Sequence, residues 1–323
     1  MIIKKIITKT TAPIISTLTD KKVKARVFNG DCMELLVALP DNSIDLTITS
    51  PPYCMGKEYE ECNDIDSFVE AHRKIFPEVV RVTKPGGNIC WQVGFFVKNG
   101  AITPLDFLVH DLLSRFAGVY LRNRIVWTFG HGLHCENRFS GRYEVVMWYS
   151  KGDQYFFDLD AVRVPQKYPG KRFAKGPKNG QLSGNPRGKN PSDIWEGLSD
   201  DVWGIPNVKA NHIEKTNHPC QFPVALATKL IRALSPKGGL VLDPFSGVAS
   251  TGVAAVLEGR RFVGAELIED YALIAKGRLK EAISGNAKVR PLEREIYVPK
   301  PTEKVAMKPE HFWPVVTEDA NPS

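Results

Sequence analysis

Two consecutive prolines stop an apolar, β-type run of this chain and fix where that strand must end. Residues 44–48 lead directly into Thr49-Ser50-Pro51-Pro52-Tyr53. Each proline fixes φ and removes an N–H donor, so the strand cannot continue past Ser50. The stop leaves a hydroxyl, two carbonyls and an aromatic ring at the carboxyl end of a strand, which is where ligands bind in open α/β sheets.

These groups suit a flat ligand that carries an amino group. Such a ligand could stack on Tyr53 and donate hydrogen bonds to Ser50 and to the carbonyl of Ser50 or Pro51. A nucleobase removed from its helix fits this description. The same residues also fit an ordinary exit from a strand into a loop, because Pro-Pro is common in turns. The rest of the chain decides between the two.

The residues around this motif predict alternating strands and helices. Residues 24–53 read as a β-α-β unit, for which a parallel crossover is the natural connection. The run Lys84-Pro85-Gly86-Gly87 is typical of a helix end. We expect strands at residues 25–29, 44–49, 88–94, 120–129 and 143–149, and helices at residues 32–39, 66–83 and 104–116.

A second alternation occupies residues 223–282. We expect helices at residues 223–234, 251–258 and 269–282, and strands at residues 240–243 and 261–266. The loop Asp243-Pro244-Phe245-Ser246-Gly247 precedes a helix and can present N–H groups to a polar ligand. It lacks the glycine and lysine density that cradles a pyrophosphate. Glu266 ends the next strand, where a carboxylate can bind the two hydroxyls of a ribose. The pattern suits a nucleoside without a pyrophosphate.

Between these halves lies a segment without acidic residues. Residues 161–192 are rich in Gly and Pro and contain no Asp or Glu. Such a segment is either a solvated linker or a surface that tracks phosphates through counterion release. For the second interpretation the candidate DNA contacts are Arg163, Lys167, Lys171, Arg172, Lys175, Lys178, Arg187 and Lys189, which are interleaved with Tyr168 and Phe173.

The chain resembles the S-adenosylmethionine-dependent amino-methyltransferases of DNA. That family carries an Asp-Pro-Phe-x-Gly loop and a Ser/Asp/Asn-Pro-Pro-Tyr motif, and the resemblance covers residues 24–282. In its β arrangement the Pro-Pro-Tyr motif comes first, then a target-recognition region, then the cofactor loop, as in this chain. The resemblance implies an α/β, Rossmann-like methyltransferase sheet that is circularly permuted. Its strands then follow one another as residues 240–243, 261–266, 25–31, 44–50 and 88–94.

The resemblance also implies roles for single residues. Phe245, Ser246 and Gly247 would wrap the methionine end of the cofactor, Glu266 would hold the ribose, and Asp31 would accept from the adenine amine. The segment from His218 to Pro223 would line the methionine carboxylate. The implied cofactor site comprises Asp31, Cys32, His218, Phe222, Pro223, Asp243, Phe245, Ser246, Gly247 and Glu266, and the implied catalytic residues are Ser50, Pro51, Pro52 and Tyr53. One departure is Ala249, where many members have a second glycine.

An exocyclic base amine is a poor nucleophile because its lone pair is delocalised into the ring. Hydrogen bonds to Ser50 and a motif carbonyl would move it toward sp³ geometry, and transfer would be direct, aided by orientation. Family members with serine at the first motif position are mostly cytosine-N4 enzymes, whereas Asp or Asn is typical of adenine-N6 enzymes. Ser50 therefore favours cytosine, with adenine as the alternative.

Other interpretations remain open. Pro219-Cys220-Gln221 matches the nucleophile motif of carbon-5 cytosine methyltransferases, although those enzymes place the cofactor loop first. A DNA-binding module without activity and a methyltransferase acting on RNA or protein amides are further alternatives. The acid-free segment and the permuted order favour duplex DNA.

The remaining features set the organisation of the chain. We expect an N-terminal extension at residues 1–23, a catalytic half at residues 24–150, a target-recognition insertion at residues 151–215, a cofactor-binding half at residues 216–283 and a loosely packed tail at residues 284–323. A net charge of +7 is compatible with a polyanionic partner. The six cysteines lack metal or disulfide spacing, so we expect reduced thiols and a cytoplasmic protein. His131, His134 and Cys135 lack a fourth ligand, so we expect no metal. We also expect no membrane span. A cognate restriction endonuclease and a homodimer are possible partners.

Overall fold

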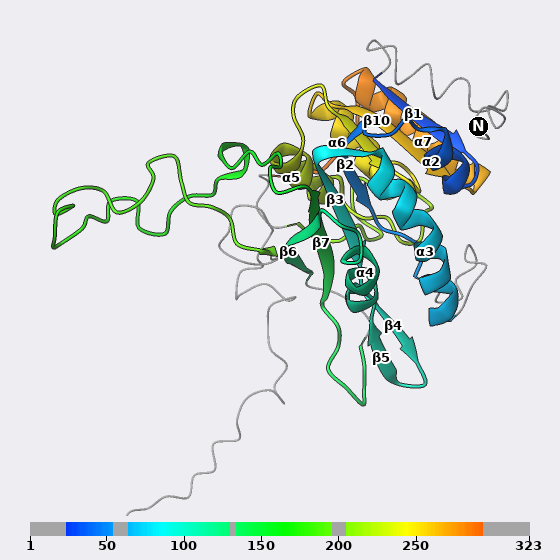
Figure 1. Ribbon diagram of the computed structural model, residues 1–323, viewed down its shortest axis with the longest axis horizontal. Coiled ribbons are helices and arrows are strands. Elements are labelled where there is room, and N and C mark those ends of the chain that lie inside the picture. The colour runs from blue at the N-terminus through cyan, green and yellow to red at the C-terminus, as the bar shows by residue number, and fades with distance from the viewer. Residues whose placement is uncertain (1–23, 54–63, 130–133, 196–204, 293–323) are drawn as a thin grey trace, which may run out of the picture.

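The computed structural model describes residues 24–53, 64–129, 134–195 and 205–292, which build an α/β fold around one large sheet (Figure 1). Its eight strands pair in the order β1-β10-β9-β2-β3-β7-β6-β8. The first five are parallel, and β7 runs antiparallel to both of its neighbours. The strands are β1 Ala25–Asn29, β2 Ile44–Thr49, β3 Thr83–Val93, β6 Val119–Thr128, β7 Tyr143–Lys151, β8 Ile194–Trp195, β9 Leu240–Asp243 and β10 Arg261–Glu266.

The two halves of the chain meet in the middle of this sheet. β9 pairs with β2 through Leu46–Val241 and Thr47–Leu242, so the C-terminal strands lie between β1 and β2. The predicted Rossmann-like sheet with a permuted chain order is thereby confirmed. The strands do not lie side by side in the predicted succession, however, because β10 and β9 separate β1 from β2. The first parallel crossover therefore spans two intervening strands.

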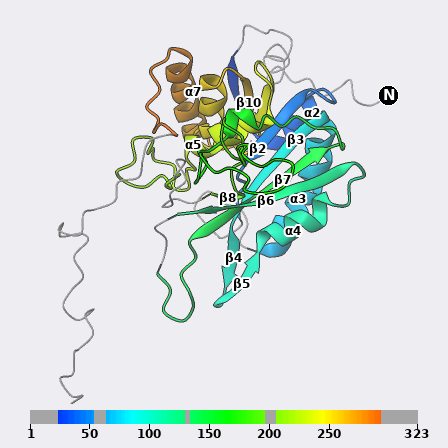
Figure 2. The same cartoon turned by 90° about the vertical axis from the view of Figure 1, so that its left-hand side faces the viewer.

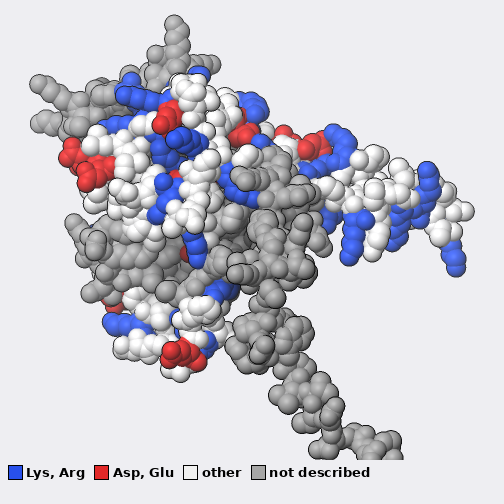
Figure 3. Space-filling model, turned by 180° about the vertical axis from the view of Figure 1, so that it is seen from behind, with Lys and Arg blue, Asp and Glu red and all other residues white. Residues whose placement is uncertain are grey.

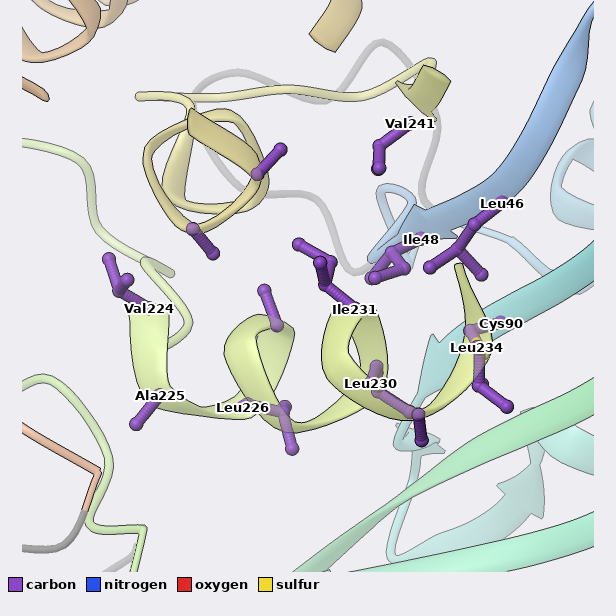
Figure 4. Packing of buried hydrophobic residues seen from close by; sticks show 14 of the residues in the cluster. Leu46, Ile48, Cys90, Val224, Ala225, Leu226, Leu230, Ile231, Leu234 and Val241 are labelled. Atoms are coloured by element: carbon purple, nitrogen blue, oxygen red, sulfur yellow. The ribbon is translucent and has the colours of Figure 1, made fainter. Parts of the chain in front are cut away.

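Helices cover both faces of the sheet (Figures 1 and 2). The helices α2 Cys32–Ala38, α3 Ile65–Val82 and α4 Leu105–Leu113 contribute to the core on one face. On the other face lie α5 Val224–Leu234, α6 Ser250–Leu257 and α7 Glu269–Ile283. Leu230, Ile231 and Leu234 of α5 pack beside Leu46 and Ile48 (Figure 4), which fixes the strand that precedes the Pro-Pro motif.

Most predicted elements lie within a few residues of their expected bounds, and residues 84–87 are the clearest exception. Helix α3 ends at Val82, and the segment we expected to close it lies within β3 instead. Thr83 pairs with Ile44 and Asn88 pairs with Leu46, so the intervening Pro-Gly-Gly segment bulges out of the ladder. The predicted end of the helix is therefore correct to within one residue, whereas the next strand begins at Thr83 rather than at residue 88, because a bulge accommodates the Pro-Gly-Gly segment within the strand.

The small hairpin of β4 Phe95–Lys98 and β5 Ala101–Pro104 was not predicted. Its two-residue turn is Asn99-Gly100, with φ of +51° and +81°. Asn-Gly between short apolar runs is a strong hairpin signal, because both positions need positive φ. The sequence therefore contained the evidence for this element.

The acid-free segment 161–192, here called the arm, projects from the body of the protein (Figure 1). Its root is a short 3-10 helix, η2 Asp160–Val162. Two antiparallel bridges, Val164–Lys189 and Arg172–Leu182, close it into a long irregular hairpin. The chain then returns to the sheet as β8, which pairs with β6, so the expected insertion at residues 151–215 includes one strand of the main sheet.

Several predictions concern residues outside the described part of the chain: the extension at residues 1–23, His131 and the tail beyond residue 292. In the described part of that tail, residues 284–286 and 288 are exposed, Leu292 is buried and the Arg290 amide donates to Glu214. Within the described ranges the cysteines are free thiols, and no helix there is both long and apolar enough to span a bilayer. The same ranges hold no cluster of side chains suited to a metal ion.

Candidate active site

One cavity of about 670 Å³ lies at the carboxyl ends of the parallel strands and is lined by both halves of the chain. Most of the residues predicted from the two motifs line it together. They are Asp31, Cys32, Ser50, Pro51, Pro52, Tyr53, His218, Phe222, Phe245, Ser246, Gly247 and Glu266. Asp243 and Pro223 lie behind this surface rather than on it. The arrangement follows from the parallel sheet, which brings the ends of β1, β2, β9 and β10 to one edge.

Asp243 joins the two halves at this edge. Its Oδ1 accepts a hydrogen bond of 2.6 Å from the Thr49 hydroxyl and one of 3.1 Å from the Phe245 amide. The side chain is 1% exposed, and burial raises the pKa of the Asp243 carboxyl to about 6. Asp243 therefore holds the loop after β9 against the end of β2, and its side chain is too deeply buried to contact a ligand.

We expect Asp243→Asn to change how stability depends on pH. The pKa of Asp243 is about 6 in the folded protein and about 4 in an unfolded chain. The folded state therefore binds the proton more tightly, and this contribution to stability is lost as pH rises from about 4 through 6. Between pH 4 and 7 the wild type should lose about 2 kcal/mol relative to the asparagine variant. Urea unfolding across that range measures this, and parallel curves for the two proteins would contradict it.

The loop after β9 is shaped for close approach of a ligand. Gly247 has φ of +49°, and a Cβ there would lie 3.1 Å from the Nε2 of His218. His218 contacts the ring of Tyr271 edge-on, with centroids 4.7 Å apart. Ala249 has φ of +59°, a left-handed conformation that favours glycine. Glycine at position 247 thus lets the His218 imidazole lie directly against the loop.

Two carboxylates lie at the neighbouring strand ends. Glu266 Oε1 accepts from the Ile268 amide at 2.9 Å, and burial raises the pKa of this carboxyl. Asp31 caps helix α2 by accepting from the Met33 amide at 2.6 Å. Burial and the nearby Asp31 charge raise the pKa of Cys32 to about 12, so its thiol is neutral. This side of the cavity therefore offers two carboxylate acceptors, the exposed Asp31 and the partly buried Glu266, beside a neutral thiol.

The Ser-Pro-Pro-Tyr motif forms the other side of the cavity, together with two residues that sequence reasoning missed. The hydroxyls of Ser50 and Tyr53 are 3.5 Å apart, and the Nε2 of Gln92 lies 3.4 Å from the Tyr53 hydroxyl. Gln92 also donates to Glu144. The only sequence signal for Gln92 and Glu144 was that each is a polar residue within an otherwise apolar strand, β3 and β7 respectively.

Cys220 also lines the cavity and is exposed. Its amide donates to the Nδ1 of His218 at 3.2 Å, within a segment that Gln221 holds by donating to the Glu214 carbonyl. Geometry alone therefore leaves the thiol accessible to a ligand.

The predicted basic residues lie along the arm, where Lys and Arg side chains gather on the projecting part of the molecule (Figure 3). Arg163 and Arg187 pair with Asp160 at its root, and Arg163 also donates to the Gly188 carbonyl. The four basic residues farthest from the root, Lys171, Arg172, Lys175 and Lys178, are all exposed. A separate hollow of about 410 Å³ lies within the arm and includes Lys167, Lys171 and Lys189 in its lining.

Comparisons with known proteins point to one family for most of the chain. The family model described as DNA methylase, for N6 and N4 enzymes, matches residues 44–277. The Type II methyltransferase M.BglII of Bacillus subtilis is 41% identical over 77% of this chain and 67% of that protein. M.ScaI of Streptomyces caespitosus is 40% identical over 79% of this chain and 81% of that protein. The DNA adenine methyltransferase YhdJ of Escherichia coli (strain K12) is 29% identical over 79% and 83%.

Solved structures agree on the fold. A Thermus thermophilus protein assigned as a DNA modification methylase, solved in complex with S-adenosyl-L-methionine, is 27% identical with a TM-score of 0.57, covering 81% of this chain and 95% of that one. The cytosine-N4-specific PvuII DNA methyltransferase has a TM-score of 0.62 at 20% identity, covering 82% and 94%, a likeness of fold alone.

Proposed function

The chain belongs to the DNA methylase family of N4 and N6 amino-methyltransferases, and we propose that it methylates the N4 amine of a cytosine flipped out of duplex DNA. The family uses S-adenosylmethionine to modify an exocyclic amine of DNA. The observation that carries the proposal for this chain is the cavity that joins the Ser50–Tyr53 motif to the loop of Phe245–Gly247 and to Glu266. A base and a nucleoside cofactor can meet there.

The residues on the cofactor side fit S-adenosylmethionine. Gly247 lets the His218 imidazole approach the loop closely, and the partly buried Glu266 carboxylate can accept from both hydroxyls of a ribose. Asp31 can accept from an adenine amine, and the neutral Cys32 thiol offers that ring an apolar contact. When bound, the cofactor supplies a methyl group on a positively charged sulfur. His218, Phe222, Phe245 and Ser246 then enclose its methionine end, while Asp243 and Pro223 support that enclosure from behind.

On the other side, Ser50 and the backbone carbonyls of the motif hold the amine of the base. Two acceptors for the two amine hydrogens turn the nitrogen lone pair toward the methyl group, and orientation supplies most of the rate enhancement. Tyr53 stacks on the flipped ring, which is worth about 1–3 kcal/mol. The serine at the first motif position favours cytosine N4. Adenine N6 is the alternative, supported by the similarity to an adenine methyltransferase.

Methyl transfer to different acceptors tests this proposal. With tritiated S-adenosylmethionine, we expect label in duplex DNA and at most background label in RNA and protein. Transfer to RNA or protein alone would support the amide or RNA alternatives. Binding of the cofactor without transfer to any acceptor would favour a module that has lost its activity.

We further propose that the arm binds the DNA backbone. Its outer residues are exposed and basic, and phosphate contacts of this kind make binding salt-dependent. The name Type II methyltransferase, shared by several relatives, also favours a cognate restriction endonuclease for this chain. A homodimer remains a proposal that sedimentation would test.

Replacing Lys171, Lys175 and Lys178 together by serine should weaken DNA binding about tenfold or more at 150 mM salt. Each lost phosphate contact should reduce the slope of log K against log salt by up to about 0.9. Cofactor affinity should not change. The matched control replaces Lys74, Lys276 and Lys280, which are exposed on α3 and α7. Equal salt slopes for both triple variants would show that the arm does not contact phosphates.

A further inference from the structure

Gln92 and Glu144 lie at the floor of the base side of the cavity. β3 and β7 are antiparallel, and Gln92 pairs with Val146, so Glu144 lies two residues along on the same face of the sheet. Gly94 leaves space between the Tyr53 ring and Glu144: a Cβ there would lie 3.3 Å from Tyr53 Cε2 and 3.5 Å from Glu144 Oε1. The strand register thus brings the ring, the amide and the carboxylate together.

The orientation of the Gln92 amide follows from its neighbours. A carboxylate only accepts hydrogen bonds, so the Gln92 nitrogen must face Glu144. Its second hydrogen is then available to the Tyr53 hydroxyl at 3.4 Å, and that hydroxyl lies 3.5 Å from Ser50 Oγ. Distances of this kind are long in proteins without substrate and shorten when the site is occupied. The result is a chain of polar contacts from Glu144 to Ser50.

The same orientation leaves one polar atom unsatisfied. Gln92 is 3% exposed, and its buried Oε1 has no hydrogen-bond partner in the described part of the chain. A glutamine kept only to stabilise the fold would gain from a partner or from replacement by an apolar residue. Side chains that break this rule are concentrated at functional sites.

We propose that Gln92, oriented by Glu144, positions the Tyr53 hydroxyl and through it the Ser50 hydroxyl for the base amine. This inference rests on the proposed function of the Ser50–Tyr53 motif. Gln92 donates to the Tyr53 oxygen, so the ring is held by its hydroxyl as well as by packing. With the ring held in this way, a base stacked on Tyr53 has its amine beside the Ser50 hydroxyl that accepts from it. Gln92 and Glu144 are therefore positioning residues.

A double-variant cycle between Gln92 and Tyr53 tests the inference. Gln92→Met keeps the shape of the side chain and removes the donor, and it should lower kcat about 10-fold or more. Cofactor affinity should be unchanged, and the unfolding midpoint unchanged or higher. Tyr53→Phe removes the hydroxyl that Gln92 holds and should lower kcat similarly. The combined variant should be no slower than the slower single variant, because both changes break one unit.

Glu144 supplies a conservative rescue. Glu144→Gln can still accept from Gln92 and should stay within about threefold of the wild-type kcat, whereas Glu144→Leu should match Gln92→Met. Gln154→Met is the matched control, because Gln154 is exposed in a loop beyond β7.

The inference would be overturned by a Gln92→Met variant with wild-type kcat, by additive losses in the combined variant, or by a kcat loss that only follows lost stability. A wild-type protein that methylates no DNA would instead refute the proposed function, so the two failures are distinguishable.

Discussion

Replacing Ser50 by alanine should reduce methyl transfer to DNA about 100-fold or more while leaving cofactor affinity within about twofold. Ser50 lies at the end of β2 and lines the cavity beside Tyr53, and it offers the only side-chain oxygen of the Ser-Pro-Pro segment. Loss of one positioned hydrogen-bonding group that acts in the transition state costs about 10²–10³ in rate. The fold should tolerate the change, because the neighbouring Thr49–Asp243 hydrogen bond remains.

The matched control for Ser50→Ala is Cys220→Ser. Cys220 lines the same cavity, but direct transfer to an amine needs no thiol nucleophile, so this variant should keep near-wild-type activity. The opposite pattern, an active Ser50→Ala variant and an inactive Cys220→Ser variant, would support attack on ring carbon by Cys220. A single-turnover assay together with cofactor titration separates loss of chemistry from loss of binding.

The second large effect is expected on cofactor binding. Glu266→Ala should weaken binding of S-adenosylhomocysteine about 10-fold to 100-fold, because hydrogen bonds to a charged group contribute about 1.5–3 kcal/mol. Glu266 ends β10, and its pKa is raised by burial, so water does not readily replace the lost acceptor. Isothermal titration calorimetry measures the affinity. Glu269→Gln, at an exposed position three residues later, is the control.

A ligand variant makes this test specific to the ribose. A 2′-deoxy form of S-adenosylhomocysteine should bind the wild type less tightly than the parent compound. The Glu266→Ala variant should discriminate between the two much less, because the acceptor of the 2′-hydroxyl is gone. Full discrimination in the variant would mean that another residue holds the ribose.

The two sequence motifs could be located without the structure because local chemistry fixes them. The prolines after Ser50 end β2, and the small residues after Asp243 form a loop before α6, so each motif lies at a strand end whatever its neighbours are. A parallel sheet then brings both ends to the same edge. The permuted order was recognisable for the same reason, from the order of the motifs along the chain.

What the sequence could not supply depends on pairing between distant strands. The contact between Gln92 and Glu144 exists only because of the register of β3 against β7. The role of Asp243 in holding Thr49 depends on β9 lying beside β2, although these residues are far apart in sequence. The bulge at residues 84–87 likewise reflects pairing with β2 rather than local helix chemistry.

The central claim is tested most directly by mass spectrometry of nucleosides from DNA of cells that express the chain, with the Ser50→Ala variant as the reference. We predict N4-methylcytosine in DNA from the wild type and none above background with the variant. N6-methyladenine in its place would keep the amine chemistry and correct the base. The appearance of 5-methylcytosine, or of the same modified nucleoside with wild type and variant alike, would contradict the account.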